Sequence, residues 1–105
     1  MNGVFKALSD PTRRTVLQLL RRRPMTAGEI CRHFAVSKPT MSAHFAVLRE
    51  ADLIHGEKAG KTIVYQLKLS VLEDAMLSFS EAMGLGVAPE PEPGAAPETI
   101  LGKLT

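Results

Sequence analysis

Two helix-start signals stand close together in the first half of the chain, and they constrain the fold more than any other feature. Thr26 and Glu29 have the S/T-x-x-E spacing of a capping box, in which each side chain accepts a hydrogen bond from the other residue's backbone N–H. Ser37 can cap a second helix, with Pro39 in its first turn, where a missing N–H loses no helical partner. Each signal precedes an apolar periodicity, so two helices follow one another with little chain between them.

The connection between these helices is only Ala35-Val36, because the first helix is expected to end near Phe34. Helices joined by so short a segment must cross at a steep angle, with Val36 as an apolar plug in the turn. The segment therefore predicts a helix-turn-helix.

The second of these helices, expected over residues 37–50, has two different faces. Met41, Phe45 and Leu48 recur at i, i+4 and i+7 and form an apolar stripe. The other face has no carboxylate before Glu50 and carries small polar and cationic residues: Lys38, Thr40, Ser42, Ala43, His44 and Arg49. Small side chains permit close approach to base edges and cations bind phosphates, so this face predicts a DNA-recognition helix. Taken alone, the stretch fits an ordinary surface helix equally well.

Helices and strands are also expected on both sides of this pair. A short helix over residues 2–8 precedes one that Asp10 caps and Pro11 begins. After residue 50, two strands around a glycine-containing turn form a hairpin with Lys58 and Lys61 near its tip. The expected fold is mainly α with a small β-hairpin: a winged helix-turn-helix of about five helices and a two-stranded wing.

The last part of the chain differs from the rest in charge and composition. Residues 1–68 hold twelve Lys and Arg against five Asp and Glu, whereas residues 69–105 hold one Lys against six acids. A final helix is expected from a Ser70 cap to about Met83. We therefore predict a DNA-binding and dimerisation domain over residues 1–86 and a flexible Pro- and Glu-rich tail over residues 87–105.

Three segments, Phe5–Arg14, Val36–Ile54 and Gly60–Leu67, resemble in order and spacing the ArsR/SmtB family of bacterial transcriptional repressors. The resemblance implies repression through a dyad-symmetric double-stranded DNA operator, bound by a homodimer. Ser37, Lys38, Thr40, Ser42 and His44 match the family's DNA-contacting positions. Arg49, Lys58 and Lys61 are better suited to phosphate contacts than to base readout.

The dimer is expected to form through the first and last helices, as the resemblance also implies. The apolar face of the last helix is wider than a small domain needs, and a helix of seven residues is too short to be stable alone. The expected interface is Val4, Phe5, Leu8, Leu72, Ala75, Met76, Phe79 and Met83.

Metal sensing is not expected, although many relatives use a cysteine pair in a Glu-Leu-Cys-Val-Cys-Asp-Leu motif. The matching segment here retains Cys31 but has His33 at the second position, and residues at i and i+2 lie about 200° apart on a helix. The last helix contains no His. We predict no metal and no cofactor, and leave two alternatives open: a metal- or thiol-responsive repressor using Cys31, and a protein-interaction module acting through the tail.

Other classes of protein are disfavoured. The sequence contains no catalytic triad pattern, phosphate-binding loop or paired carboxylates that would indicate an enzyme. It has no signal peptide and no apolar run approaching about 18 residues, which predicts a cytoplasmic protein without a membrane partner. The effector, the operator sequence and the regulated genes are not readable from these residues.

Overall fold

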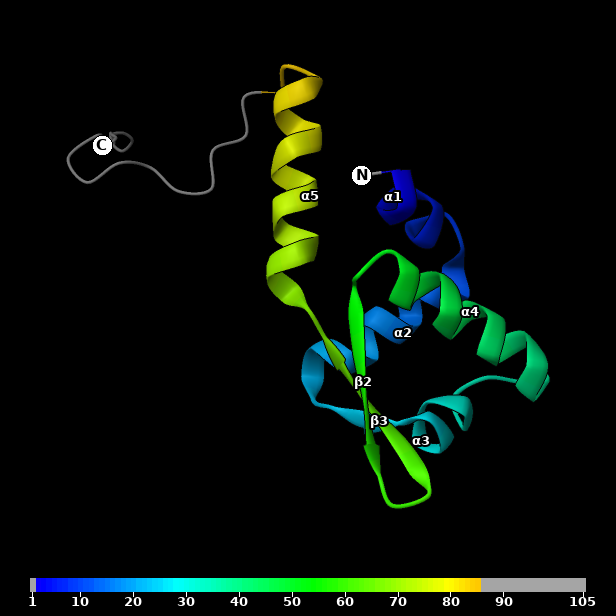
Figure 1. The fold of residues 1–105 in the computed structure, drawn as a ribbon. Helices are drawn as coiled ribbons and strands as arrows, with labels where there is room; N and C mark the ends of the chain where they lie inside the picture. The colour runs from blue at the N-terminus through cyan, green and yellow to red at the C-terminus, as the bar shows by residue number, and fades with distance from the viewer. Residues whose placement is uncertain (1, 86–105) are drawn as a thin grey trace, which may run out of the picture. The chain divides into compact units, whose positions relative to one another are not determined.

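The computed structural model describes residues 2–85, so the predicted tail at residues 87–105 lies outside the described range. The chain divides into two units, residues 1–75 and 76–105, and the last helix continues through the boundary. Figure 1 shows the elements in order, which are α1 (Asn2–Leu8), α2 (Pro11–Arg22), β1 (Met25–Thr26), α3 (Ala27–Cys31), α4 (Lys38–Glu50), β2 (Ile54–Ala59), β3 (Thr62–Leu67) and α5 (Leu69–Ala82).

The predicted start signals of three helices are confirmed by their hydrogen bonds. Asp10 caps α2 by accepting from the Arg13 N–H at 3.1 Å. The capping box of α3 is complete: the Glu29 carboxylate accepts from the Thr26 N–H at 2.8 Å, and the Thr26 hydroxyl accepts from the Glu29 N–H at 3.0 Å. Ser37 caps α4 through the N–H of Thr40. Local sequence therefore determines where these helices begin.

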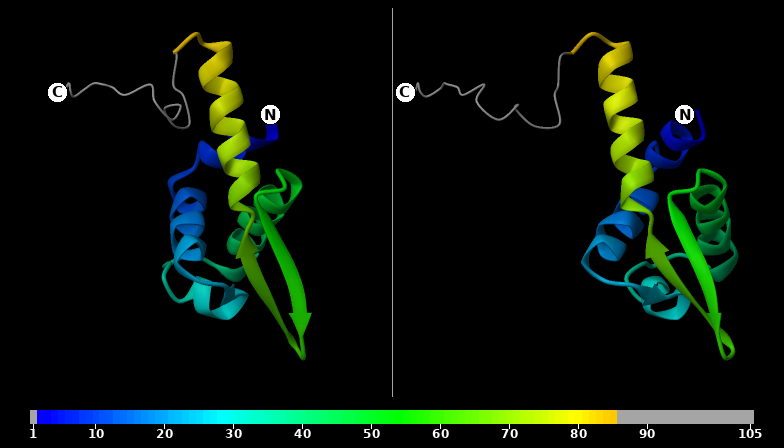
Figure 2. Two further views of the ribbon diagram at one scale, coloured as in Figure 1. Left: turned by 90° about the vertical axis from the view of Figure 1, so that its left-hand side faces the viewer. Right: turned by 60° about the vertical axis from the view of Figure 1, so that its left-hand side comes forward.

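The wing belongs to a three-stranded antiparallel sheet with the order β1-β3-β2, where two strands were predicted. The additional strand is Met25–Thr26, whose residues pair with Tyr65 and Val64 of β3. Two residues are too few to show the alternation that identifies a strand in a sequence. The β2-β3 hairpin extends past α3 and forms the wing (Figure 2).

Three smaller predictions are corrected. Helix α3 ends at Cys31 because the next N–H groups, those of His33 and Phe34, bond three residues back and tighten the chain into turns. The connection to α4 is therefore longer than predicted, and Val36 is 44% exposed rather than an apolar plug. Helix α5 begins at Leu69, so Ser70 lies in its first turn and is not its cap.

The C-terminal end of α4 is a sharp turn that leads into the wing. Asp52 adopts a positive φ of 61°, while the Leu53 N–H donates to the Leu48 carbonyl at 3.0 Å and the Asp52 N–H donates to the Arg49 carbonyl at 2.9 Å. This is the Schellman pattern, accompanied here by full burial of both Leu48 and Leu53. The turn thus sets the direction in which β2 leaves the helix.

The core joins the helix-turn-helix to the rest of the body. Its largest fully buried side chains come from α2, α3, α4 and the turn after α4: Val16, Ile30, Met41, Leu48 and Leu53. The first half of α5 also belongs to the body, since Ala75 is buried and Val71 and Leu72 pack against the core. The helices and the wing are therefore held by one apolar cluster. Across residues 2–85, no helix combines the length and apolarity needed to cross a membrane.

Gly56 in β2 allows the wing to pack closely. Gly56 pairs with Tyr65 of β3, and a Cβ added at Gly56 would lie 2.8 Å from Tyr65 Cε1 and 3.0 Å from Ile63 Cγ2. Both distances are shorter than ordinary van der Waals contact. Any side chain at residue 56 would therefore displace these two residues.

Replacing Gly56 with Ala should destabilise the protein, because the new methyl group overlaps the ring of Tyr65. We expect the free energy of unfolding to fall by about 1–3 kcal/mol, measured by urea denaturation. Gly28→Ala is the control, because its Cβ would meet nothing closer than Thr26 Oγ1 at 3.9 Å. Since Ala favours a helix more than Gly does, this change should raise the free energy of unfolding by up to about 1 kcal/mol. Equal stability of Gly56→Ala and the wild type would contradict the proposed packing.

Candidate nucleic-acid interface

The exposed face of α4 holds most of the predicted DNA-binding residues. Ser37, Lys38, Thr40 and Ser42 are all exposed. The Ser37 hydroxyl donates to Thr40 Oγ1 at 2.9 Å and accepts from the Thr40 N–H, so these two residues order the first turn together. The start of α4 therefore presents hydroxyl groups and a cation on a rigid helical turn.

The tip of the wing carries two cations. Lys58 lies in β2 and Lys61 follows Gly60, whose φ of +65° makes the tight turn. Both lysines are exposed, and neither forms a hydrogen bond or an ion pair in the part of the chain that the structure describes. Their charges are thus available to an anionic partner.

Arg49 connects α4 to the wing. Its Nη1 donates to the Tyr65 hydroxyl at 2.9 Å, and the rings of Phe45 and Tyr65 lie with their centroids 4.9 Å apart. Arg49 was predicted to contact phosphate. The structure adds an internal role, since one donor of its guanidinium holds the wing while the side chain stays exposed.

His44 differs from the other predicted DNA-binding residues. Only 15% of its side chain is exposed, Nδ1 lies 3.1 Å from Arg13 Nη1, and Nε2 lies 3.9 Å from Asp10 Oδ2. Since a guanidinium has no acceptor, Arg13 Nη1 donates this hydrogen bond and His44 Nδ1 accepts it. The ring is therefore held by contacts within the protein, and its role in DNA contact stays a prediction.

Arg13 links three helices at this point. Besides its contact with His44, its Nε donates to the Ala7 carbonyl at 2.9 Å and its Nη2 to the Lys6 carbonyl at 2.8 Å. Both carbonyls lie in the last turn of α1; the Lys6 carbonyl also accepts from the N–H and the hydroxyl of Ser9. A single side chain of α2 therefore caps α1 and contacts α4.

The Asp10 carboxylate completes this cluster. Desolvation raises its pKa, whereas hydrogen bonds from the backbone N–H groups of Arg13 and Thr12 and the positive charge of Arg13 lower it, and the resulting pKa lies below its ordinary value of 3.8. Because the pKa is lowered by folding, the charged cap stabilises the protein above pH 3.8 and this contribution is lost as the pH falls further.

The predicted dimer-interface residues differ in exposure. Val4 and Ala75 are buried in the body, and Phe5, Leu8 and Leu72 are partly buried. In the second unit, Met76 and Phe79 are each 38% exposed and Met83 is 60% exposed. The second half of α5 thus presents more apolar surface than α1 does.

Two residues were not singled out from the sequence. Ala46 is partly exposed on α4, one turn after the exposed Ala43 that the sequence had placed on the polar face, and its small side chain would allow a close approach to DNA. Arg32 is exposed at the end of α3 and lines a groove together with Lys38 and Ser42. Arg32 could have been predicted from the sequence, because it is a cation placed between the two helices of the helix-turn-helix.

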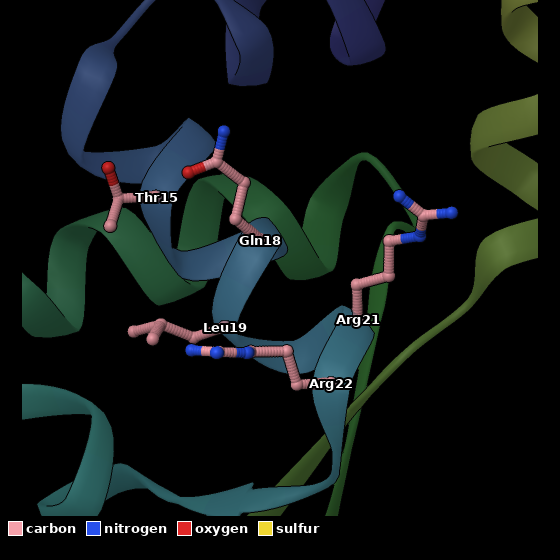
Figure 3. A pocket seen from close by; sticks show the side chains of 5 residues that line it. All are labelled: Thr15, Gln18, Leu19, Arg21 and Arg22. Carbon is pink, nitrogen blue, oxygen red and sulfur yellow. The ribbon is translucent and has the colours of Figure 1, made fainter.

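The arginines of α2 do not form a comparable site. Thr15, Gln18, Leu19, Arg21 and Arg22 line a hollow of about 470 Å³, and all five belong to this one helix (Figure 3). Arg21 and Arg22 extend in opposite directions in this view. Side chains of a single convex helix cannot enclose a ligand, so this surface is a solvated cationic face.

Comparison with known proteins identifies the family. A model of a helix-turn-helix domain matches residues 8–57. The transcriptional repressor SdpR of Bacillus subtilis (strain 168) is 49% identical over 82 residues, which are 75% of this chain and 91% of that protein. An arsenical resistance operon repressor of Staphylococcus aureus is 34% identical over 80 residues, covering 76% of this chain and 77% of that protein.

Solved structures agree with these relatives. A crystal structure of an ArsR family transcriptional regulator superposes with a TM-score of 0.73 at 31% identity, covering 80% of this chain and 92% of that chain. Fold and interface therefore define a winged helix-turn-helix transcription regulator that binds DNA and is not an enzyme. The chain belongs to the ArsR/SmtB family, as its sequence segments predicted.

The residues expected at the cysteine-pair metal site of this family do not fit a metal. Cys31 lines the groove beside α4, whereas His33 lines a separate hollow with Leu19, Arg22 and Met25. Within residues 2–85, no group of three or more potential ligands is close enough to hold an ion. Two side chains that open onto different hollows cannot form the closed tetrahedral set of a bound Zn²⁺.

Replacing Arg13 with Met should lower the free energy of unfolding by about 1–2 kcal/mol, because the Ala7 carbonyl and the His44 ring, both in partly buried contacts, lose their donor. Arg14→Met is the matched control. Arg14 is exposed and makes one such bond, to the Leu8 carbonyl, so the loss should stay below about 0.5 kcal/mol. Equal losses in the two variants, measured by urea denaturation, would show that Arg13 does not link the three helices.

Proposed function

We propose that the protein represses transcription by binding a dyad-symmetric operator as a homodimer. Each subunit would place α4 in the major groove and the tip of the wing against the flanking phosphate backbone. Two copies related by a two-fold axis would present their recognition helices about 34 Å apart, one turn of DNA.

The observation that carries this proposal is the joint presentation of α4 and the wing. Lys38 and Ser42 lie on the edge of α4 that faces β3, and the contact between Arg49 and Tyr65 holds that edge against the wing. No carboxylate interrupts α4 before Glu50. An acid-free helical edge beside a lysine-tipped hairpin has the charge and dimensions that a DNA groove and its backbone require.

Dimerisation is supported by exposed apolar side chains toward the end of α5. Met76 and Phe79 of α5 recur with Met83, which directly follows the helix, at i, i+3 and i+7, and the Met83 N–H still donates to the Phe79 carbonyl at 3.0 Å. A second copy of the chain that covered these side chains would remove them from water. The same association would supply the second recognition helix that a symmetric operator needs.

Lys38→Gln should weaken operator binding and also make it less dependent on salt, because one phosphate contact is lost. The slope of log affinity against log salt should become shallower by about 0.9. Operator DNA is obtained by selecting bound sequences from random DNA with the purified protein, and affinity is then measured by fluorescence anisotropy over a salt series.

Arg21→Gln is the control for this experiment, since it removes the same charge from the exposed face of α2. Its slope should equal that of the wild type. Equal changes in both variants would mean that Lys38 acts only through net charge. A wild-type protein that selects no DNA at low salt would contradict the proposed function as a whole.

Met83→Glu should weaken the dimer, because an unpaired carboxylate would be buried between the subunits. We expect the dissociation constant of the dimer to rise about tenfold or more, measured by light scattering against the 11.4 kDa mass of one chain. Ser78→Glu is the control on the opposite side of α5 and should leave the dimer intact. A dimer that resists Met83→Glu would exclude this face as the interface.

A further inference from the structure

A groove of about 630 Å³ lies in the body, between α3, the first half of α4 and β3. Its walls are Cys31 of α3, Val36 of the turn, Phe45 of α4, and Ile63 and Tyr65 of β3. This volume falls within the range that small-molecule sites occupy. Metal binding, DNA binding and dimerisation do not account for the apolar lining of this groove.

The chemistry of the groove is divided between floor and rim. Phe45 and Tyr65 form a buried apolar floor, and Val36 and Ile63 keep 44% and 39% of their surface exposed. Lining side chains include two cations and no carboxylate. The cations, Arg32 and Lys38, are exposed and form no ion pair in the described part of the chain.

We propose that this groove binds a small amphipathic organic anion, with its apolar body on the aromatic floor and its carboxylate on Arg32 and Lys38. Apolar contact supplies most of the affinity, and the two cations select against neutral and cationic molecules of the same shape. A phosphate backbone alone would satisfy the cations but would leave the exposed Val36 and Ile63 without an apolar partner.

A bound anion would also exclude DNA, and this part of the inference rests on the proposed function. Lys38 and Ser42 line the groove and belong to the edge of α4 assigned to DNA. A carboxylate paired with Lys38 neutralises that cation and adds a negative charge where a phosphate would lie. The anion is therefore an inducer that releases the operator by competition.

Cys31 allows the binding arm to be tested without DNA, because it is the only cysteine in the sequence and lines the groove. The probe is decanoate, and the measurement is the rate at which iodoacetamide alkylates Cys31. Bound decanoate should slow alkylation in a saturable manner. In the series octanoate, decanoate and dodecanoate, each added CH₂ that is buried should tighten binding by up to about fourfold.

A second amphiphile and a set of variants separate specific binding of decanoate from its effects as a detergent. Decyltrimethylammonium has the same chain and the opposite charge, and should give no protection. Arg32→Gln and Ile63→Ser should each weaken protection by about three- to tenfold, whereas Arg21→Gln on α2 should not. Far-UV circular dichroism checks that the fold persists, since unfolding would speed alkylation.

The two arms fail in different ways. Absence of protection by any carboxylate of the series, or equal protection by decyltrimethylammonium, would overturn the anion site. Protection of Cys31 without any loss of operator affinity would contradict the competition between anion and DNA, while the anion site itself would stand. If the wild type binds no DNA, the proposed function fails, while the alkylation result still decides whether the groove binds anions.

Discussion

The side chain of Tyr65 lies where the sheet meets α4, and the relative position of these two elements depends on it. Its backbone pairs with Met25 on one side and Gly56 on the other, so it holds the middle of the sheet. Its ring packs on Phe45 and its hydroxyl accepts from Arg49. Because one residue contacts both neighbouring strands and α4, the wing and α4 are held together as one surface.

Much of this fold was predictable because the signals that specify it are local. A cap and the helix that follows lie within four residues, as at Asp10 and Thr26, and the sequence alone predicted both correctly. One error concerns a distant strand pairing and another a local change of hydrogen bonding at the end of α3. Strand β1 exists only because β3 pairs with it, and Val36 is exposed because α3 ends early in turns. Neither pairing nor early termination has a signature in the residues themselves.

The candidate site shows the same limit on a finer scale. Helical periodicity placed Lys38 and His44 on one polar face of α4, but it could not show which edge of that face another helix covers. The structure places His44 against Arg13 and leaves Lys38 exposed. Arg13 and Lys38 differ accordingly. The planar guanidinium of Arg13 suits several acceptors in fixed positions, whereas the ammonium group of Lys38 is a point charge on a flexible chain and suits a partner whose position is not fixed.

This division explains why net charge describes the interface poorly. Arg13, Arg14 and Arg49 all donate to groups within the protein, so part of the basic excess of residues 1–68 is engaged in holding the fold. Of the exposed cations that remain, Lys38 lies on one edge of α4 and Lys58 and Lys61 lie near the tip of the wing, whereas Arg21 and Arg22 lie on α2. Since that edge of α4 also borders the apolar groove, a ligand and DNA would compete for the same charges without any change in conformation. Regulation of this kind needs neither a metal nor a second cysteine.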